Sequence, residues 1–298
     1  MGKKMMAISL LLVVFLSFTA CGEGAEEDAG LPPAQEIVDG VIESFDNIRT
    51  YQWELVVIQY HTGEAEGEVL EQTVTIENRG TLDLEKLQMS AEVSMVVNMV
   101  APEEDEIEQR AETYIIDGMM YGKAEEPGIE EPMWTKEELP AQAWEIMKGL
   151  SGLENYRELL KTAQVEVVGS EKVKGVDCYV LQLTPEIAQL LQTTGGGFAG
   201  GVPGAPPVPE ELLQDMFRSF SVKQWIAKDT YFLMKAEIDS VMQLTSEFWE
   251  YLGEEAEMGE EAQMSIDSTL SFLAYNYNQP VTIEVPQEAL EEIEAPME

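Results

Sequence analysis

The chain has 298 residues with 17 basic and 57 acidic side chains, which gives a formal net charge of −40 at pH 7. Such a surface repels phosphate backbones and anionic headgroups, so the composition argues against nucleic acid as a partner and against electrostatic docking on a membrane. With 45% hydrophobic residues and five tryptophans, the chain is too apolar to be disordered and is long enough for one large domain.

The first 21 residues have the layout of a signal for export. Lys3 and Lys4 precede an apolar run from residue 5 to residue 18, which is too short for a membrane span of ~20 residues. Small residues and then Cys21 follow, an order that resembles the lipobox of bacterial lipoproteins. We therefore expect residues 1–20 to be a lipoprotein signal peptide. Lipidated Cys21 would then hold the exported chain to the outer face of the cell membrane through its acyl chains; the alternative is an ordinary signal, or an uncleaved anchor, with a cysteine there by chance.

The segment after the anchor changes character at residue 34. Residues 21–33 lack apolar periodicity and are expected to form a flexible tether, and residues 34–298 a single domain. That domain opens with an amphipathic helix over residues 34–48. Its apolar residues fall at helical spacing on one stripe: Ile37, Val38, Val41, Ile42, Phe45 and Ile48.

From Thr50 onward, apolar and polar residues alternate, which is the period of a strand. In the clearest case, residues 86–100, the polar face is interrupted only by Val96. The apolar face of that segment consists of Leu87, Met89, Ala91, Val93, Met95, Val97 and Met99. The same pattern recurs at residues 51–57, 74–76, 232–244 and 264–274. Strands that are half apolar and half polar belong to an antiparallel sheet with one covered face.

Turn signals divide the chain into roughly ten expected strands. Asp117-Gly118 is a strong two-residue hairpin signal, and Lys174-Gly175 and Lys228-Asp229 indicate further reversals. Helical spacing returns only over residues 136–161 and in short pieces near 185–191 and 210–217. The pattern predicts an α+β fold, a large curved antiparallel sheet with few helices on its apolar concave face. Because those helices are too few to cover a wide sheet, either the sheet closes tightly on itself or a cavity remains.

Residues typical of enzyme or metal sites are scarce. His61 is the only histidine and is expected in an exposed turn, and Cys178 is expected to be a buried hydrophobic residue of a strand. Acidic runs such as residues 103–106 and 254–261 have the character of solvated loops and lack the form of a calcium loop. We therefore expect no catalysis, no metal and no cofactor.

A Gly/Pro-rich insertion occupies residues 194–209. Because no GK[ST] follows its glycines, it is not a phosphate-binding loop, and a disordered insertion is the favoured interpretation. The alternative is a mobile flap at a cavity mouth, with Phe198 and Val202 as its apolar contact points.

Several methionines fall on the apolar strand faces, where they are either core fillers or the lining of an adaptable pocket. We expect the set to face inward and to line a ligand cavity. The candidate lining residues are Leu87, Met89, Val93, Met95, Val97, Met234, Ile238, Met242, Ile266 and Phe272.

Three segments in the second half of the chain resemble a known superfamily. They are the hairpin segment at residues 169–181, Trp225-Ile-Ala-Lys-Asp-Thr-Tyr231, and Tyr275-Asn-Tyr-Asn-Gln-Pro280 with the residues that follow. As a set they resemble the LolA/LolB-like superfamily, especially LppX/LprG-type bacterial lipoproteins. The resemblance implies an open half-barrel around helices, with an apolar cavity that carries a lipid or acylated molecule without catalysis.

Two functions therefore compete. In the first, the chain is a membrane-anchored carrier or sensor of a lipid or acylated ligand. In the second, it is a structural or partner-binding surface lipoprotein whose sheet is fully packed by its own helices. The sequence names neither a ligand nor a protein partner.

Overall fold

The computed structural model describes the chain at residues 31–65, 68–101, 104–125, 128, 132–139, 159–185, 212, 215–248 and 263–294. The described elements belong to one compact unit, Pro33–Glu298. The elements of this unit in chain order are α1 (Ala34–Ser44), η1 (Phe45–Asn47), β1 (Thr50–Ala65), β2 (Glu68–Asp83), β3 (Gln88–Ala101), β4 (Asp105–Ile116), β5 (Met119–Glu125), β6 (Thr135–Glu138), β7 (Gln164–Val173), β8 (Val176–Thr184), β9 (Phe217–Ala227), β10 (Leu233–Leu244), β11 (Gln263–Tyr275) and α7 (Gln287–Glu294).

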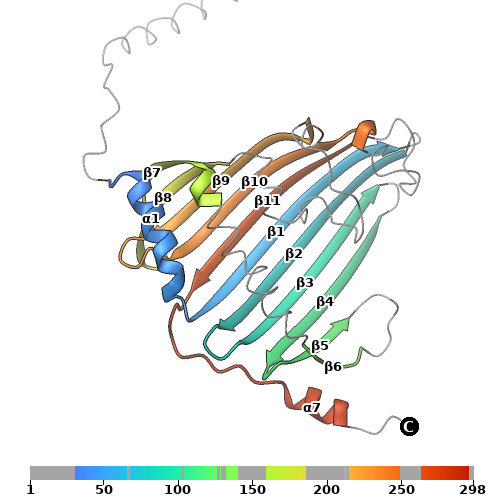
Figure 1. The fold of residues 1–298 in the computed structure, drawn as a ribbon. Helices are drawn as coiled ribbons and strands as arrows, with labels where there is room; N and C mark the ends of the chain where they lie inside the picture. Colours follow the sequence, from blue (N-terminus) through green and yellow to red (C-terminus); the bar gives the residue numbers. More distant parts are fainter. Residues whose placement is uncertain are drawn as a thin grey trace, which may run out of the picture. The chain divides into compact units, whose positions relative to one another are not determined.

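The strands form one sheet of eleven in the order β6-β5-β4-β3-β2-β1-β11-β10-β9-β8-β7. All described neighbours are antiparallel, and β6 and β7 are the two edges, so the sheet stays open rather than closing into a barrel (Figure 1). β1 and β11 pair in the middle of the sheet, so strands from opposite ends of the chain lie side by side. The predicted α+β class with a large antiparallel sheet and few helices is confirmed, with eleven strands where the sequence indicates about ten.

The predicted turns at Asp117-Gly118 and Lys174-Gly175 join β4 to β5 and β7 to β8. Both residues of each turn have positive φ, 52° and 76° in the first and 46° and 86° in the second. This is the turn geometry that matches the twist of a two-residue hairpin, and glycine adopts it without steric cost. Both predictions are confirmed, as is the reversal at residues 228–230 between β9 and β10.

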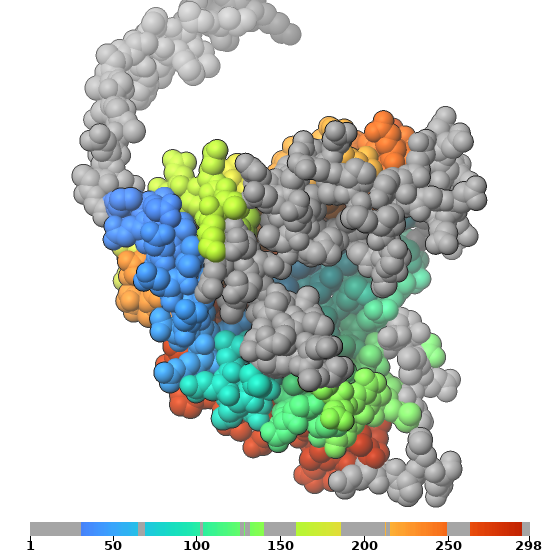
Figure 2. Space-filling view, viewed as in Figure 1, coloured from blue at the N-terminus to red at the C-terminus, as the bar shows by residue number. Residues whose placement is uncertain are grey.

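α1 packs on the part of the sheet that holds β8 and β9. Ile37 and Val41 are fully buried, and they belong to one core cluster with Leu181, Leu183 and Val222. Leu160 is in the same cluster, and the blue α1 and the yellow-green segment at residue 160 lie together in Figure 2. The helix predicted over residues 34–48 is α-helical to Ser44 and ends in the short η1.

A close contact fixes α1 against the β9–β10 hairpin. A Cβ atom at Gly40 would lie 2.6 Å from the ring of Tyr231, so only glycine allows this approach. Tyr231 itself has a φ of 57°, an unusual conformation for a bulky residue. Its carbonyl oxygen accepts a hydrogen bond of 3.3 Å from the Ser44 hydroxyl. The hairpin tip is thereby attached to the end of the helix.

The sheet has two chemically different faces. We call the side that α1 covers the α1 face, and Tyr51 of β1 contacts the α1 cluster from it. On the opposite side, Ala289 of α7 is fully buried in a cluster with Tyr121 and Trp134, and the Trp134 backbone N–H donates a hydrogen bond of 3.0 Å to Glu292 Oε1. We call this side the α7 face.

One predicted helical segment is partly a strand. Residues 136–138 belong to β6, which pairs with β5 from Gly122 opposite Thr135 to Met119 opposite Glu138. Pairing with a neighbouring strand has overridden the local helical spacing there. Residues 159–162 are helical, and residues 140–158 lie outside the described part of the chain.

Candidate ligand-binding face

The register of the sheet aligns apolar side chains in rows across the α1 face. One row runs Ile238, Leu270, Val57, Ile76, Met95 across β10, β11, β1, β2 and β3. The next row runs Ala236, Phe272, Leu55, Asn78, Val93 across the same strands. Directly paired residues of antiparallel strands project to the same side of a sheet. We call these two rows the central apolar rows.

The central apolar rows are less buried than the cores beside them. Leu55, Val57, Ile76, Val93 and Met95 are all only partly buried. Within the described residues, none of the five belongs to a hydrophobic core cluster, whereas α1 packs over β8 and β9 to one side. The middle of the α1 face is therefore an apolar surface that α1 leaves uncovered.

The only polar member of these rows is bound to a neighbouring ring. Asn78 Oδ1 accepts a hydrogen bond of 2.9 Å from the indole Nε1–H of Trp53. The Trp53 ring lies over Gly80, where a Cβ atom would be 2.3 Å from it. Because the glycine leaves room for the ring, the Trp53 indole lies against Gly80 beside the apolar rows.

A group of polar side chains interrupts the α1 face farther along β1 and β2. Gln72 Nε2 donates a hydrogen bond of 3.0 Å to His61 Nδ1, and the other ring nitrogen of His61 lies 3.4 Å from Gln59 Oε1. His61 is half-buried, and burial lowers its pKa below the usual range. The expectation of an exposed turn is wrong for His61: it lies inside β1, paired with Gln72 and Ile266, because the hairpin reverses several residues later.

Eight of the ten predicted lining residues lie on the α1 face. Most are partly buried, and Met242 is buried in a cluster with Phe217 and Phe248. The eight residues are Met89, Val93, Met95 and Val97 of β3, Ile238 and Met242 of β10, and Ile266 and Phe272 of β11.

The expectation is wrong for Met234 and Leu87. The pairing of β10 with β9 shifts between Leu233 and Lys235, so a bulge turns Met234 to the other side, where it packs with Trp225. Leu87 lies before β3 in the turn that follows β2, with a φ of 57°, and its side chain is 42% exposed. Neither residue lines the α1 face.

Other candidate positions lie outside the described residues. These are Cys21, the possible flap residues Phe198 and Val202, and the whole insertion at 194–209.

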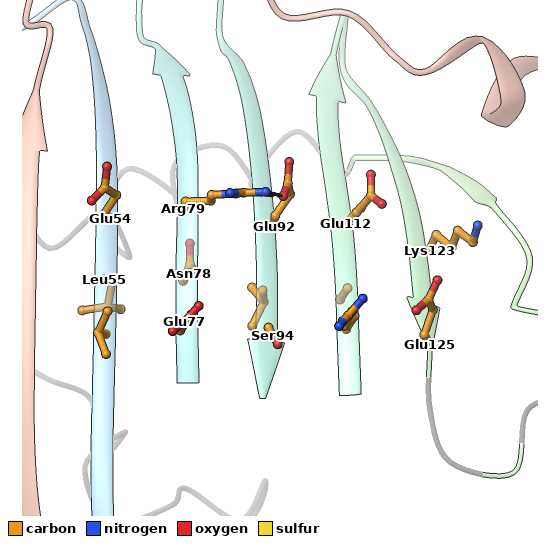
Figure 3. A pocket seen from close by; sticks show the side chains of 14 residues that line it. Glu54, Leu55, Glu77, Asn78, Arg79, Glu92, Ser94, Glu112, Lys123 and Glu125 are labelled. Carbon is orange, nitrogen blue, oxygen red and sulfur yellow. Dashed lines mark hydrogen bonds and ion pairs between the residues drawn. The ribbon is translucent and has the colours of Figure 1, made fainter. Parts of the chain in front are cut away.

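The α7 face carries a charged hollow that the sequence alone does not predict. It has a volume of about 600 Å³ and lies over β1–β5 (Figure 3). Arg79 Nε donates a hydrogen bond of 2.9 Å to Glu92, and Glu54 accepts one of 2.8 Å from the Tyr275 hydroxyl. That bond and the nearby Lys174 hold the pKa of Glu54 below its usual range. Because these charged side chains are largely exposed, the hollow is a solvated surface rather than an apolar pocket.

The described residues offer little for catalysis. Cys178 is fully buried, and burial raises the pKa of its thiol, so it packs as a small hydrophobic residue and is a poor nucleophile. No group of three or more His, Cys, Asp or Glu side chains in the described ranges is placed to hold a metal ion. No helix there is both long and apolar enough to span a membrane.

The chain is therefore an open antiparallel sheet whose α1 face is largely apolar and whose α7 face carries a charged hollow. Residues 33–294 match the model of a family described as "Family of unknown function (DUF6612)", and the chain belongs to this family. No curated protein matches the sequence.

Several solved structures resemble the chain at low identity. The lipoprotein LppX of Mycobacterium tuberculosis is 11% identical with a TM-score of 0.38, over 85% of this chain and 100% of that one. LprF from Mycobacterium bovis is 14% identical with a TM-score of 0.40, over 86% and 99%. A putative outer membrane lipoprotein-sorting protein domain from Vibrio parahaemolyticus is 8% identical with a TM-score of 0.23, over 84% and 95%. Likenesses this slight transfer nothing about ligands or partners to this chain.

Proposed function

We propose that the chain is an exported, membrane-anchored lipoprotein that binds a lipid or another acylated molecule on its α1 face and catalyses no reaction. The observation that carries the proposal is the pair of central apolar rows. They cross five strands, and α1 packs near their β10 end but leaves their members on β1, β2 and β3 uncovered. Apolar surface that the chain's own core leaves partly exposed is typical of binding sites for apolar ligands.

The chemistry of the described side chains supports binding rather than catalysis. Both ring nitrogens of His61 face glutamine side chains, and the Cys178 thiol is buried. Neither residue has a neighbour that would activate it for proton transfer or nucleophilic attack. A ligand on the central apolar rows would contact methyl, thioether and aromatic groups, which bind acyl chains without reacting with them.

The anchor is the second part of the proposal. The lipobox-like order ending at Cys21 supports acylation of that residue. Twelve residues separate Cys21 from Ala34, a tether that reaches about 40 Å when extended. With a net charge of −40 the chain is not attracted to anionic headgroups, so acyl chains rather than basic patches would hold it at the membrane.

A pair of tryptophan substitutions on adjacent residues tests the binding face. Val93 belongs to the central apolar rows, and Ser94, the next residue of β3, projects to the α7 face. Val93→Trp should fold and should bind a hydrophobic fluorescent dye more weakly than the wild type, because the indole occupies ligand space. Ser94→Trp should bind the dye as the wild type does.

The competing function, a scaffold with a fully packed core, predicts a different result. In that case the wild type binds no dye and Val93→Trp unfolds, because an indole overpacks a closed core. Dye titration and thermal unfolding on the same samples separate the two outcomes.

A further inference from the structure

Away from the tip of the β1–β2 hairpin, the α1 face of the described central strands carries no charged side chain. In β1, β3, β10, β11 and the part of β2 from Val69 to Asp83, every Asp, Glu, Lys and Arg of known register projects to the α7 face, as Glu54, Arg79 and Glu92 do in Figure 3. A chain with 74 charged residues thus keeps this described part of its surface neutral. On the described central strands, a ligand on the α1 face would therefore meet no cation that could pair with a carboxylate or a phosphate.

Neutral polar side chains nevertheless form a band across this face. Ser240, Ser268 and Gln59 are paired in one row, and His61 and Gln72 are paired in the next. We call these five residues the polar band. On one side it borders the central apolar rows, and on the other side Leu244, Met264 and Leu70 resume the apolar pattern. Packing of the apolar face gives no reason for a polar band within it.

The hydrogen bonds inside the polar band leave donors and acceptors free. An amide nitrogen only donates, so Gln72 Nε2 fixes His61 Nδ1 as an acceptor and places the ring proton on Nε2, toward Gln59 Oε1. Gln59 Nε2, Gln72 Oε1 and the Ser268 hydroxyl then have no partner among the described residues. These three groups are one amide donor, one carbonyl acceptor and one hydroxyl.

Polar groups in a partly buried apolar face are costly without partners. The Gln59 amide and the Ser268 hydroxyl can donate to an ester carbonyl, and the Gln72 carbonyl can accept from a hydroxyl. Burial lowers the pKa of His61, so its ring is neutral near pH 7 and supplies no charge for an anion. The band therefore suits an oxygen-rich group without charge.

We propose that the polar band recognises the ester or hydroxyl group of an uncharged acyl lipid, while the central apolar rows hold its acyl chain. The α1 face would thereby select acylglycerol-type lipids over fatty-acid carboxylates and phospholipids. This inference rests on the proposed function, since it requires that the α1 face binds an acylated ligand.

Three lipids with the same acyl chain test this selectivity. The mature chain from residue 21, produced without acylation or detergent, is loaded with the uncharged dye Nile red at pH 8. The dye is then displaced by 1-monooleoylglycerol, by oleate or by dioleoylphosphatidylglycerol. We expect monooleoylglycerol to displace the dye at a concentration at least about tenfold lower than oleate, because oleate has no donor for the Gln72 carbonyl and would bring an unpaired charge onto a face whose described central strands supply no cation. Equal displacement by all three lipids, or a preference for oleate, would overturn the inference.

Near-isosteric variants assign the selectivity to the band. Gln59→Met and Gln72→Met keep the side-chain length and remove hydrogen bonding by that side chain. Each variant should therefore bind monooleoylglycerol more weakly than the wild type and bind oleate equally well. Asn98→Met in β3 lies on the α7 face and is the matched control, which should behave as the wild type. Selectivity that survives both glutamine variants would refute a role for the band. If circular dichroism shows that a variant does not fold, the order in which the three lipids displace the dye from the wild type still decides whether the α1 face is selective.

The same titration distinguishes this inference from the proposed function. A wild type that binds no Nile red and none of the three lipids contradicts the proposed function itself. A wild type that binds the dye and all three lipids equally well retains the proposed function and loses only the selectivity.

Discussion

Single residues determine the surface of the α1 face. The Trp53 ring can lie this close to the neighbouring strand only because Gly80 has no side chain. A methyl group at Gly80 would also lie 2.4 Å from the Ser90 carbonyl oxygen, which is backbone and cannot move aside. The indole donates to Asn78, so displacing it would also break a hydrogen bond at the edge of the apolar rows.

Gly80→Ala should therefore destabilise the fold by about 1–3 kcal/mol, the usual cost of overpacking. Gly122→Ala is the matched control, because a Cβ atom there would meet its nearest neighbour, Thr135, at 3.6 Å. The measurement is urea unfolding followed by tryptophan fluorescence. Equal midpoints for the two variants would show that the Trp53 contact is not tight.

His61 should contribute a pH dependence to stability. Burial lowers its folded-state pKa below the ordinary 6.5, so the unfolded chain takes up the proton first as the pH falls. Stability that depends on neutral His61 is present above about pH 6.5 and is lost as the pH falls toward the folded-state pKa. His61→Gln should therefore lose less stability than the wild type between pH 7 and pH 5. Parallel urea midpoints for the two proteins over that range would contradict this.

At the scale of elements, alternation predicts strands well and bulges poorly. The apolar face of β3 and the hairpin at Asp117-Gly118 follow from the sequence, because period and turn chemistry are local. The side of the sheet that Met234 faces does not follow from the sequence. One extra residue in β10 turns Met234 to the other face without changing the local pattern. Residues 136–138 form a strand because β5 lies beside them, and that pairing is not encoded in the segment's own spacing.

Two methionines on the same face allow a matched comparison of packing. Met242 is buried in a core cluster, whereas Met95 is partly buried in the central apolar rows. Met242→Ala should cost ~2–5 kcal/mol because a cavity opens among packed neighbours. Met95→Ala should cost less than half as much, since exchangeable space already lies beside it. Thermal or urea unfolding of the ligand-free variants measures both costs, and equal costs would indicate that the central rows are fully packed.

At the scale of the whole molecule, the proposed anchor and the proposed binding face belong to different parts of the chain. Residues 1–21 alone predict the anchor, and the family match begins after them, at residue 33. The neutral polar band could not be predicted, because it depends on the register between β1, β2, β10 and β11, strands far apart in the chain.

Replacing Cys21, the proposed acylation site, should release the chain from the membrane. Cys21→Ala should abolish labelling by radioactive palmitate and leave uncleaved or shed protein. Cys178→Ala is the control, because the other cysteine is fully buried and should not be acylated. Palmitate labelling and membrane fractionation of both variants check this. Undiminished labelling of Cys21→Ala would refute the anchor.

The central claim is that the α1 face holds an acylated molecule. Its most direct test is native mass spectrometry of the mature chain from residue 21, produced in bacteria without acylation and purified without detergent. We predict a mass above that of the polypeptide, with an excess that solvent extraction removes and identifies as lipid. A clean polypeptide mass that stays unchanged after incubation with monooleoylglycerol would contradict the claim and favour the scaffold.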